Sequence, residues 1–231
     1  MSALRKNILL AIDPSLRASG WAAFCLRSAK PICVGVVSAP GPAELLSKRL
    51  DALQSKLEQL FDSLEMAKGD ILVCEGPAPL VLNPLSALKV ERVRSMFETI
   101  ARTRKVDVPG RLNPRTVQTE LLGLRGAQLP RKKVKLIARQ VAERLYGDNL
   151  SKLFLNNGHV SSKRQLPQDV VDAVLVGVSV LARIQVACST GMKLNELFVP
   201  KNSKNMAENK CSSLGWSDAE IGRMLKSRRL E

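Results

Sequence analysis

Four acidic residues stand where a fold could gather them for chemistry. Asp13 and Glu75 each end a short apolar run that has the character of a buried strand. If the two strands are parallel neighbours, both carboxylates project at the same edge of one sheet, which is where α/β folds place their sites. Asp169 and Asp172 lie three residues apart near the start of an otherwise apolar helix, so they share one face of it. Neither has a basic residue at helical spacing to neutralise it.

The chemistry that suits such a group is metal-dependent hydrolysis. Crowded carboxylates repel one another strongly unless a divalent cation neutralises them. Oxygen ligands favour Mg²⁺, with Mn²⁺ as the expected substitute. Two such ions, roughly 3.5–4 Å apart, can activate a water and stabilise the leaving oxygen of a phosphodiester. Taken singly, each acid fits a structural role in a turn, a strand end or a helix cap. The joint pattern favours a metal site.

The charge of the chain indicates a polyanionic partner. Its net charge is +15, from 36 basic and 21 acidic residues. Such a surplus costs self-repulsion in the folded state, and nucleic acid is the usual partner that offsets it. Aromatic residues make up only 3% of the chain, which argues against a protein that binds single strands by base stacking. The basic residues do not gather on one short amphipathic helix, so a membrane surface is disfavoured.

Composition places the chain among globular proteins of a reducing compartment. With 231 residues, 45% of them hydrophobic, it can bury a sizeable core. No apolar run approaches the roughly 20 residues of a membrane span, and the apolar stretch near the N-terminus is too short for a signal peptide. We therefore expect a cytoplasmic protein with no membrane partner. The five cysteines show no CxxC spacing, which argues against a zinc site and predicts reduced thiols. Four of them lie within apolar runs and are expected in the core: Cys25, Cys33, Cys74 and Cys188.

The hydrophobic pattern predicts the elements that must position the acids. Leucines that alternate spacings of four and three over residues 44–66 predict a helix, and we interpret it as a crossover that makes the two acid-ended strands parallel. Residues 147–165, which include His159, are polar and predict a loop. The predicted strands are 7–13, 20–27, 31–38, 70–75 and 105–109. The other predicted helices are 85–104, one that begins at Asn113-Pro114, 131–146 and 167–187.

The chain changes character near its C-terminal end. We expect one domain over residues 1–190 and a basic tail over 191–231. Residues 200–215 are rich in Lys, Asn and Ser, which is typical of a flexible linker. Ser217 and Glu220 form a capping-box pattern that predicts a short final helix.

At this point the sequence resembles a known family, the RuvC Holliday-junction resolvases. The similar segments occur in the family's order and cover about residues 7–187. They are the first acid-bearing strand and turn AIDPSLRASGW, the second acid-bearing strand LVCEGP, the following helix SALKVERVRSM, the substrate-facing segment NPRTVQTELLGLRGA with the basic RKKVK, and the final helix QDVVDAVLVGV.

The resemblance implies an α/β fold of the RNase H-like class, with a five-stranded mixed sheet flanked by helices. It implies Mg²⁺ held by Asp13, Glu75, Asp169 and Asp172, and a homodimer whose subunits each nick one strand of a four-way DNA junction. The helix after Glu75 would contribute to the dimer interface. The basic residues on the segment matching 111–139 are expected to contact DNA, because Lys and Arg pair with phosphates. The expected contacts are Arg115, Gln118, Arg131, Lys132, Lys133 and Lys135.

The sequence departs from the family pattern at three places. Ser15 stands where the family has glycine after Asp-Pro, and Gln118 stands where a lysine is common. No aromatic follows Glu75 at the place of the residue that probes the junction centre. Leu80 or Leu82 is the candidate wedge there.

Three other functions fit parts of the pattern. A non-enzymatic protein that binds branched DNA would be expected to have lost at least one acid, and none is lost. A nuclease for forks, flaps or RNA–DNA hybrids would keep the acids and differ in shape recognition. An actin-like or sugar-kinase-like ATPase needs two such domains and a Gly-rich adenosine loop, and the chain shows neither.

Overall fold

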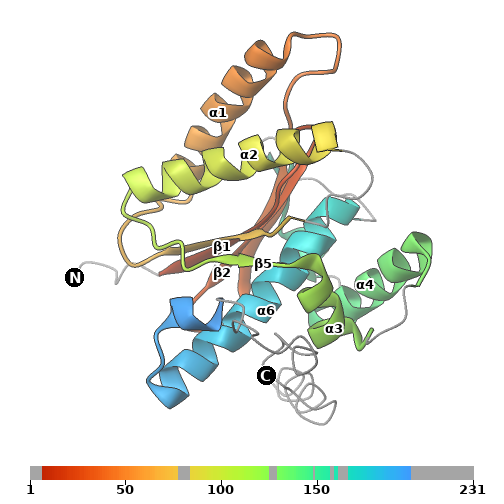
Figure 1. Ribbon diagram of the computed structural model, residues 1–231. Helices are drawn as coiled ribbons and strands as arrows, with labels where there is room; N and C mark the ends of the chain where they lie inside the picture. Colours follow the sequence, from red (N-terminus) through yellow and green to blue (C-terminus); the bar gives the residue numbers. More distant parts are fainter. Residues whose placement is uncertain are drawn as a thin grey trace.

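The structure is a computed structural model that describes residues 7–77, 84–124, 129–147, 149–156, 159–160 and 166–198. Within them a mixed sheet of seven strands, in the order β5-β4-β1-β2-β3-β6-β7, forms the middle layer (Figure 1). The strands are β1 (Ile8–Asp13), β2 (Ser19–Cys25), β3 (Pro31–Val37), β4 (Ile71–Glu75), β5 (Arg111–Leu112), β6 (Phe154–Asn156) and β7 (His159–Val160).

The first four strands have the predicted arrangement. β1, β2 and β3 form an antiparallel meander, and β4 returns parallel to β1 on its other side. The connection to β4 runs through α1 (Leu46–Ser63), which is the crossover helix that the leucine spacing predicted. β1 therefore lies between β2 and β4 in the sheet.

Both faces of the sheet are covered, which explains why β1 is apolar without alternation. Leu10 and Ile12 face the core shared with α1 and α2 (Pro84–Thr103). Leu9 and Ala11 point to the opposite face and pack with α6 (Gln168–Thr190). Figure 1 shows α1 and α2 on one side of the sheet and α6 on the other. The other helices on the α6 side are α3 (Pro114–Leu122), α4 (Arg131–Tyr146) and α5 (Asn149–Lys152).

The helix α6 is apolar on nearly all sides because it is packed in the core. By length and composition it could cross a membrane, with a mean hydropathy of 1.9 over its most apolar stretch. Of that stretch, 72% is buried against the rest of the protein. This is the pattern of a core helix, which passes the same test of length and composition.

The prediction of five strands was wrong in number and in one position. Residues 105–109 contribute only an isolated bridge between Asp107 and Ile71, and the strand forms at Arg111–Leu112 instead. Pro109 has no N–H to donate, which interrupts the ladder at that place. The predicted loop 147–165 contains β6, which adds to β3 in parallel, and β7. β6 has three residues and β7 two, so neither is long enough to show an alternating pattern within a mainly polar segment.

Two smaller predictions also need correction. His159 lies in β7 and not in a loop. Cys25 and Cys74 are buried as predicted, whereas Cys33 is half-buried and Cys188 is exposed. Cys188 falls in the last turn of α6, where the helix residues are exposed beyond the covered part of the sheet. All four of these cysteines are free thiols.

The described residues continue past the end of α6 as far as Phe198. A 3₁₀ turn covers Leu194–Leu197, and Phe198 follows it. Phe198 packs against the core, with the Arg183 guanidinium 5.8 Å from the centre of its ring. The linker 200–215 and the helix beginning at Ser217 lie outside the described residues, so the division of the chain at residue 190 stays a prediction.

A buried ion pair ties α3 to α6. Both Nη atoms of Arg183 donate to the Glu120 carboxylate, at 2.7 and 2.8 Å, and each side chain is only 1% exposed. Removing one partner of such a pair leaves an uncompensated buried charge. We expect Glu120→Gln to lower the free energy of unfolding by about 3–5 kcal/mol. Urea denaturation measures it, and a loss below about 1 kcal/mol would show that Arg183 finds other partners.

Candidate active site

The sheet brings Asp13 and Glu75 to one edge. The parallel ladder between β1 and β4 ends at the pair Ile12–Cys74, one residue before each acid. Both acids are therefore the last residues of neighbouring parallel strands, and both are partly buried. This is the arrangement that the two acid-ended apolar runs predicted.

A close approach between α6 and β2 brings the other two acids to the same edge. Asp13 pairs with Gly20 in the β1–β2 ladder. A Cβ on Gly20 would lie 2.0 Å from the main-chain oxygen of Asp169 and 2.6 Å from the nitrogen of Val170. Only glycine leaves room for the helix to begin there. Asp169 occupies the first turn of α6, and Asp172 follows one turn later.

The carboxyl groups of Asp13 and Glu75 form a hydrogen bond with each other. One of two hydrogen-bonded carboxyl groups must carry the proton. Burial, followed by the charges of Glu75 and Asp172, raises the pKa of Asp13 well above its usual range. Burial likewise raises the pKa of Glu75 to about 7, although the hydrogen bond from Asp13 and the charge of Arg94 oppose the rise. The pair is thus a site that holds a proton near neutral pH.

Asp169 and Asp172 also resist ionisation, mainly because they are partly buried. Burial raises the pKa of Asp169, and the charges of Lys135, Arg131 and Arg17 oppose it. Burial raises the pKa of Asp172, while a hydrogen bond from Gln168 lowers it. The Gln168 side-chain nitrogen donates to Oδ1 of Asp172 at 2.9 Å. Asp169 raises the pKa of both Asp13 and Asp172, so the four acids form one electrostatic group.

The chemistry of this group fits a hard divalent cation. Its donors are all carboxylate oxygens, and the proton shared by Asp13 and Glu75 can be exchanged for a positive ion. As the side chains stand, no three described His, Cys, Asp or Glu residues converge closely enough to hold one ion. Binding would therefore draw carboxylates inward, and the four acids are the residues that would hold it.

The raised pKa of Glu75 predicts a pH-dependent stability for the metal-free protein. Its pKa is about 7 in the folded state and 4.5 ordinarily, so the folded state binds more protons between these values. The stabilisation is complete below about pH 4.5 and is lost as the pH rises through about 7. We expect Mg²⁺ to stabilise the protein more at pH 8 than at pH 5.5. Urea denaturation with EDTA or Mg²⁺ measures this, and equal Mg²⁺ effects at both pH values would contradict it.

Candidate DNA contacts surround a small cleft beside the acids. The cleft has a volume of about 170 Å³ and lies where α3, α4 and α6 meet. Glu75 and Asp172 line it together with Gln118, Arg131 and Lys135. The structure thus brings three of the predicted contact residues next to two of the acids. The remaining described ones, Arg115, Lys132 and Lys133, are exposed and do not line the cleft.

Several residues of the site escaped sequence reasoning. Arg17, in the turn after β1, lies near enough to Asp169 to affect its charge. Arg139 acts on Asp172 in the same way, and it also donates to the main-chain oxygen of Leu166, just before α6. The position of Arg139, four residues after Lys135 on α4, was the available signal. The candidate wedge residues, Leu80 and Leu82, lie outside the described residues.

A larger cavity, of about 520 Å³, lies elsewhere and does not compete for this chemistry. It is between β3 and α1, and most of its walls are apolar, among them Trp21, Val36 and Leu60. Its described lining residues include no carboxylate. The assignment of the site therefore follows the acids and not the larger volume.

Comparison with known proteins gives a structural match and no sequence match. No protein-family model matches the chain, and no curated protein matches it. The solved structure of T. thermophilus RuvC in complex with Holliday junction substrate matches with a TM-score of 0.53 and 16% sequence identity. A second Thermus thermophilus RuvC structure matches with a TM-score of 0.52 and 17% identity. Each match covers 80% of this chain and 96% of the RuvC chain.

The chain has a RuvC-like fold. The sequence resemblance therefore correctly predicted the fold class, a mixed sheet flanked by helices, although the strand number differs. At this level of identity the RuvC-like fold does not itself assign a reaction. The roles of Asp13, Glu75, Asp169 and Asp172 stay a prediction, and their support is the electrostatic group that they form at the sheet edge.

Proposed function

We propose that the protein is a metal-dependent, structure-specific DNA endonuclease that nicks four-way junctions. The observation that carries the proposal is the acid group, in which Asp13 and Glu75 end neighbouring parallel strands and the close approach of α6 to Gly20 brings Asp169 and Asp172 to the same edge. Divalent ions at such a site supply an activated water and neutralise charge on the phosphodiester. Asp13, Glu75, Asp169 and Asp172 would hold Mg²⁺, and Mn²⁺ would substitute.

The cations around the acids support a phosphodiester substrate. Arg131 and Lys135 on α4 line the cleft that also contains Glu75 and Asp172. Arg17 approaches Asp169 from the turn after β1. Together they place positive charge beside a group of acids, which is what a DNA backbone passing over a metal site requires. The net charge of +15 supports the same substrate.

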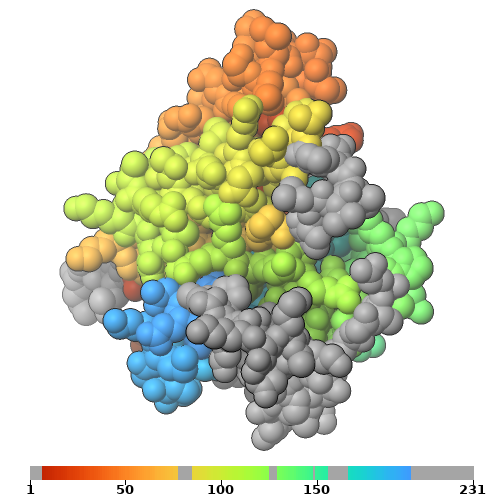
Figure 2. Space-filling view, viewed as in Figure 1, coloured from red at the N-terminus to blue at the C-terminus, as the bar shows by residue number. Residues whose placement is uncertain are grey.

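We further propose that the protein acts as a homodimer through α2. Leu85 and Leu88, on the outer side of α2, are 71% and 59% exposed. Beside Leu88, a groove between α1 and α2 is lined by Leu50 and Met96. Figure 2 shows α1 and α2 at the surface in the upper part of the view. Exposed apolar groups of this kind are typical of subunit contacts. Sedimentation equilibrium measures the mass, and a monomer at micromolar concentration would contradict the proposal.

The deciding experiment compares nicking of labelled substrates that share sequence and differ in shape. The substrates are a four-way junction, a replication fork, a linear duplex and an RNA–DNA hybrid, each with Mg²⁺ and with EDTA. We expect paired, symmetrical nicks in the junction that EDTA abolishes. Preference for the fork or the hybrid would keep the nuclease and replace the junction assignment. Tight binding without cutting in Mg²⁺ or Mn²⁺ would show that the protein is a branched-DNA-binding protein instead.

The basic residues of α4 predict a specific change in salt dependence. Each phosphate contact contributes about 0.9 to the slope of log K against log salt concentration. We expect the double variant Arg131→Gln, Lys135→Gln to weaken junction binding in EDTA and to lower this slope by about 2. Lys48→Gln, which removes an exposed lysine of α1, is the control and should leave the slope unchanged. Fluorescence anisotropy measures both, and an unaltered slope in the double variant would remove α4 from the DNA interface.

A further inference from the structure

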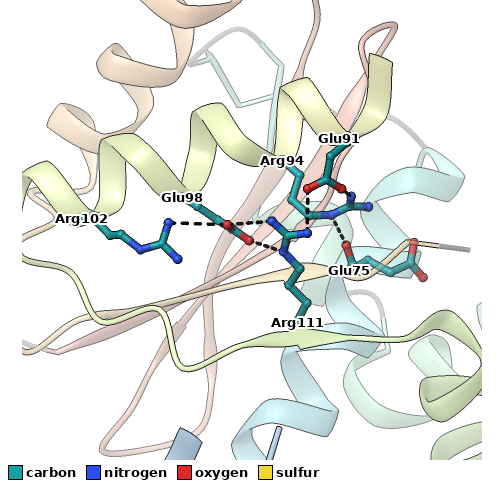
Figure 3. Close-up of polar contacts among 6 residues, drawn as sticks. All are labelled: Glu75, Glu91, Arg94, Glu98, Arg102 and Arg111. Atoms are coloured by element: carbon teal, nitrogen blue, oxygen red, sulfur yellow. Dashed lines mark hydrogen bonds and ion pairs between the residues drawn. The ribbon is translucent and has the colours of Figure 1, made fainter. Parts of the chain in front are cut away.

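A buried arginine of α2 holds the main chain at Glu75. The Nε of Arg94 donates to the main-chain oxygen of Glu75 at 2.7 Å, and the Arg94 side chain is only 3% exposed. That oxygen lies beyond the last β1–β4 pair, Ile12–Cys74. In Figure 3 the Glu75 side chain points away from Arg94. The arginine therefore fixes the backbone of this acid and leaves its carboxylate free for the acid group.

Arg94 is held in turn by a chain of alternating charges (Figure 3). Its Nη1 donates to one oxygen of Glu91, and the other oxygen of Glu91 accepts from Arg111 at 2.7 Å. Arg111 also donates to both oxygens of Glu98, at 2.6 and 2.9 Å. Such forked pairs fix geometry as well as charge. The network thus joins Arg94 to β5, which contains Arg111.

Two elements, α2 and β5, hold the end of β4 in place. On one side α2 contributes Arg94, and on the other β5 pairs with the last two residues of β4, Cys74 with Arg111 and Glu75 with Leu112. The next residue, Gly76, donates its N–H to the main-chain oxygen of Leu112 at 2.6 Å. The end of the strand is therefore fixed at successive residues.

The end of β4 needs this support because of the charges beside it. Asp13 and Glu75 end neighbouring parallel strands, and carboxylates brought to one sheet edge repel one another when they are ionised, which pushes the strand ends apart. The β1–β4 ladder stops before Glu75 and cannot resist that push. Groups behind the ligands of a metal commonly determine how well the ligands are oriented.

We propose that Arg94 is a positioning residue that holds the main chain of Glu75 so that its carboxylate stays within the acid group and can bind a divalent cation. This inference rests on the proposed function. It assigns to the Glu91–Arg111–Glu98 network the task of keeping Arg94 in place.

The test is Mn²⁺ affinity measured by calorimetry without DNA, beside nicking over a range of Mg²⁺ concentrations. Arg94→Lys keeps the charge and loses the fixed Nε bond together with the forked geometry. We expect it to weaken Mn²⁺ binding about tenfold, the lower end of the usual effect of removing such a supporting group. Nicking should then be restored by higher Mg²⁺, and junction affinity in EDTA should not change.

A matched control separates positioning from general stability. Arg183→Lys alters a second buried arginine that pairs with a carboxylate but has no contact with Glu75. It should lower the melting temperature and leave Mn²⁺ affinity unchanged. Glu91→Gln provides a second, milder variant if Arg94→Lys does not fold. It weakens one support of Arg94, and we expect Mn²⁺ affinity to fall two- to threefold.

The outcomes distinguish the inference from the proposed function. If Arg94→Lys, or Glu91→Gln in its place, binds Mn²⁺ as tightly as the wild type, the positioning role is wrong. The role is also wrong if Arg183→Lys weakens Mn²⁺ binding equally, because loss of stability would then explain both. If the wild type binds no Mn²⁺ at all, the metal-dependent function fails first and the inference fails with it.

Discussion

Asp13→Asn is expected to abolish nicking and, at the same time, to make the metal-free protein more stable. The substitution removes a carboxylate that burial and the charges of Glu75 and Asp172 hold in an unfavourable state. We expect the nicking rate to fall at least about 10³-fold, roughly 4 kcal/mol of transition-state stabilisation. We expect the melting temperature in EDTA at pH 8 to rise by roughly 2–8 °C, which corresponds to about 1–2 kcal/mol.

The control is a second buried aspartate at the opposite end of the β1–β4 pair, beside the start of β1. Asp70, just before β4, is fully buried and accepts hydrogen bonds from the main-chain nitrogens of Ile8 and Ala67, at 2.9 and 2.8 Å. Asp70→Asn turns one acceptor into a donor, so it should lower stability by about 1–3 kcal/mol and leave nicking intact. Differential scanning calorimetry and the junction assay together test the pair. A destabilised Asp13→Asn protein would show that this acid supports the fold.

Gly20→Ala is expected to reduce nicking about 100-fold while the protein still folds and binds DNA. A Cβ at this position would overlap the main-chain oxygen and carbon of Asp169, at 2.0 and 2.1 Å, so the start of α6 must move. A displacement of about 1 Å in a reacting group commonly costs about 10²-fold in rate. Asp169 and Asp172 would move with the helix, away from Asp13.

Gly41→Ala is the matched substitution, because a Cβ at Gly41 meets nothing within 4 Å. It should leave nicking, Mn²⁺ affinity and melting temperature at wild-type values. The Gly20→Ala protein should show weaker Mn²⁺ binding and unchanged junction affinity in EDTA. If Gly20→Ala cuts at the wild-type rate, the acids of α6 do not need their present distance from β1, and their proposed role loses its support.

The sequence was sufficient to predict the parts of the site that depend on local pattern. Asp13 and Glu75 were placed correctly because acids at the ends of neighbouring parallel strands lie at the same edge of the sheet. Asp169 and Asp172 were placed on one helix face by their spacing. The crossover helix followed from the leucine spacing together with the rule for connecting parallel strands, and the meander followed from three apolar runs joined by short turns.

What depends on packing between distant elements could not be predicted. Asp169 has no cation at helical spacing, yet Arg131 and Lys135 reach it from α4. The bond from Arg94 goes to a main-chain oxygen, which every residue has, so the type of residue 75 contains no sign of it. The clearance at Gly20 likewise depends on where α6 begins in space. The strands β6 and β7, of three and two residues, are too short to form a recognisable pattern.

The four acids come from distant parts of the chain, and this has a consequence for the cell that makes the protein. Asp13 is contributed by the first strand, and Asp169 and Asp172 by the last long helix, which packs across β1 and β2. A nascent chain on the ribosome, or a fragment truncated before α6, therefore has only two of the four acids, Asp13 and Glu75. Under the proposed function, such a fragment would keep the cations of α4 and lack two of the acids needed for cutting. Two inactive halves divided between α4 and α6 should regain activity only when they reassociate.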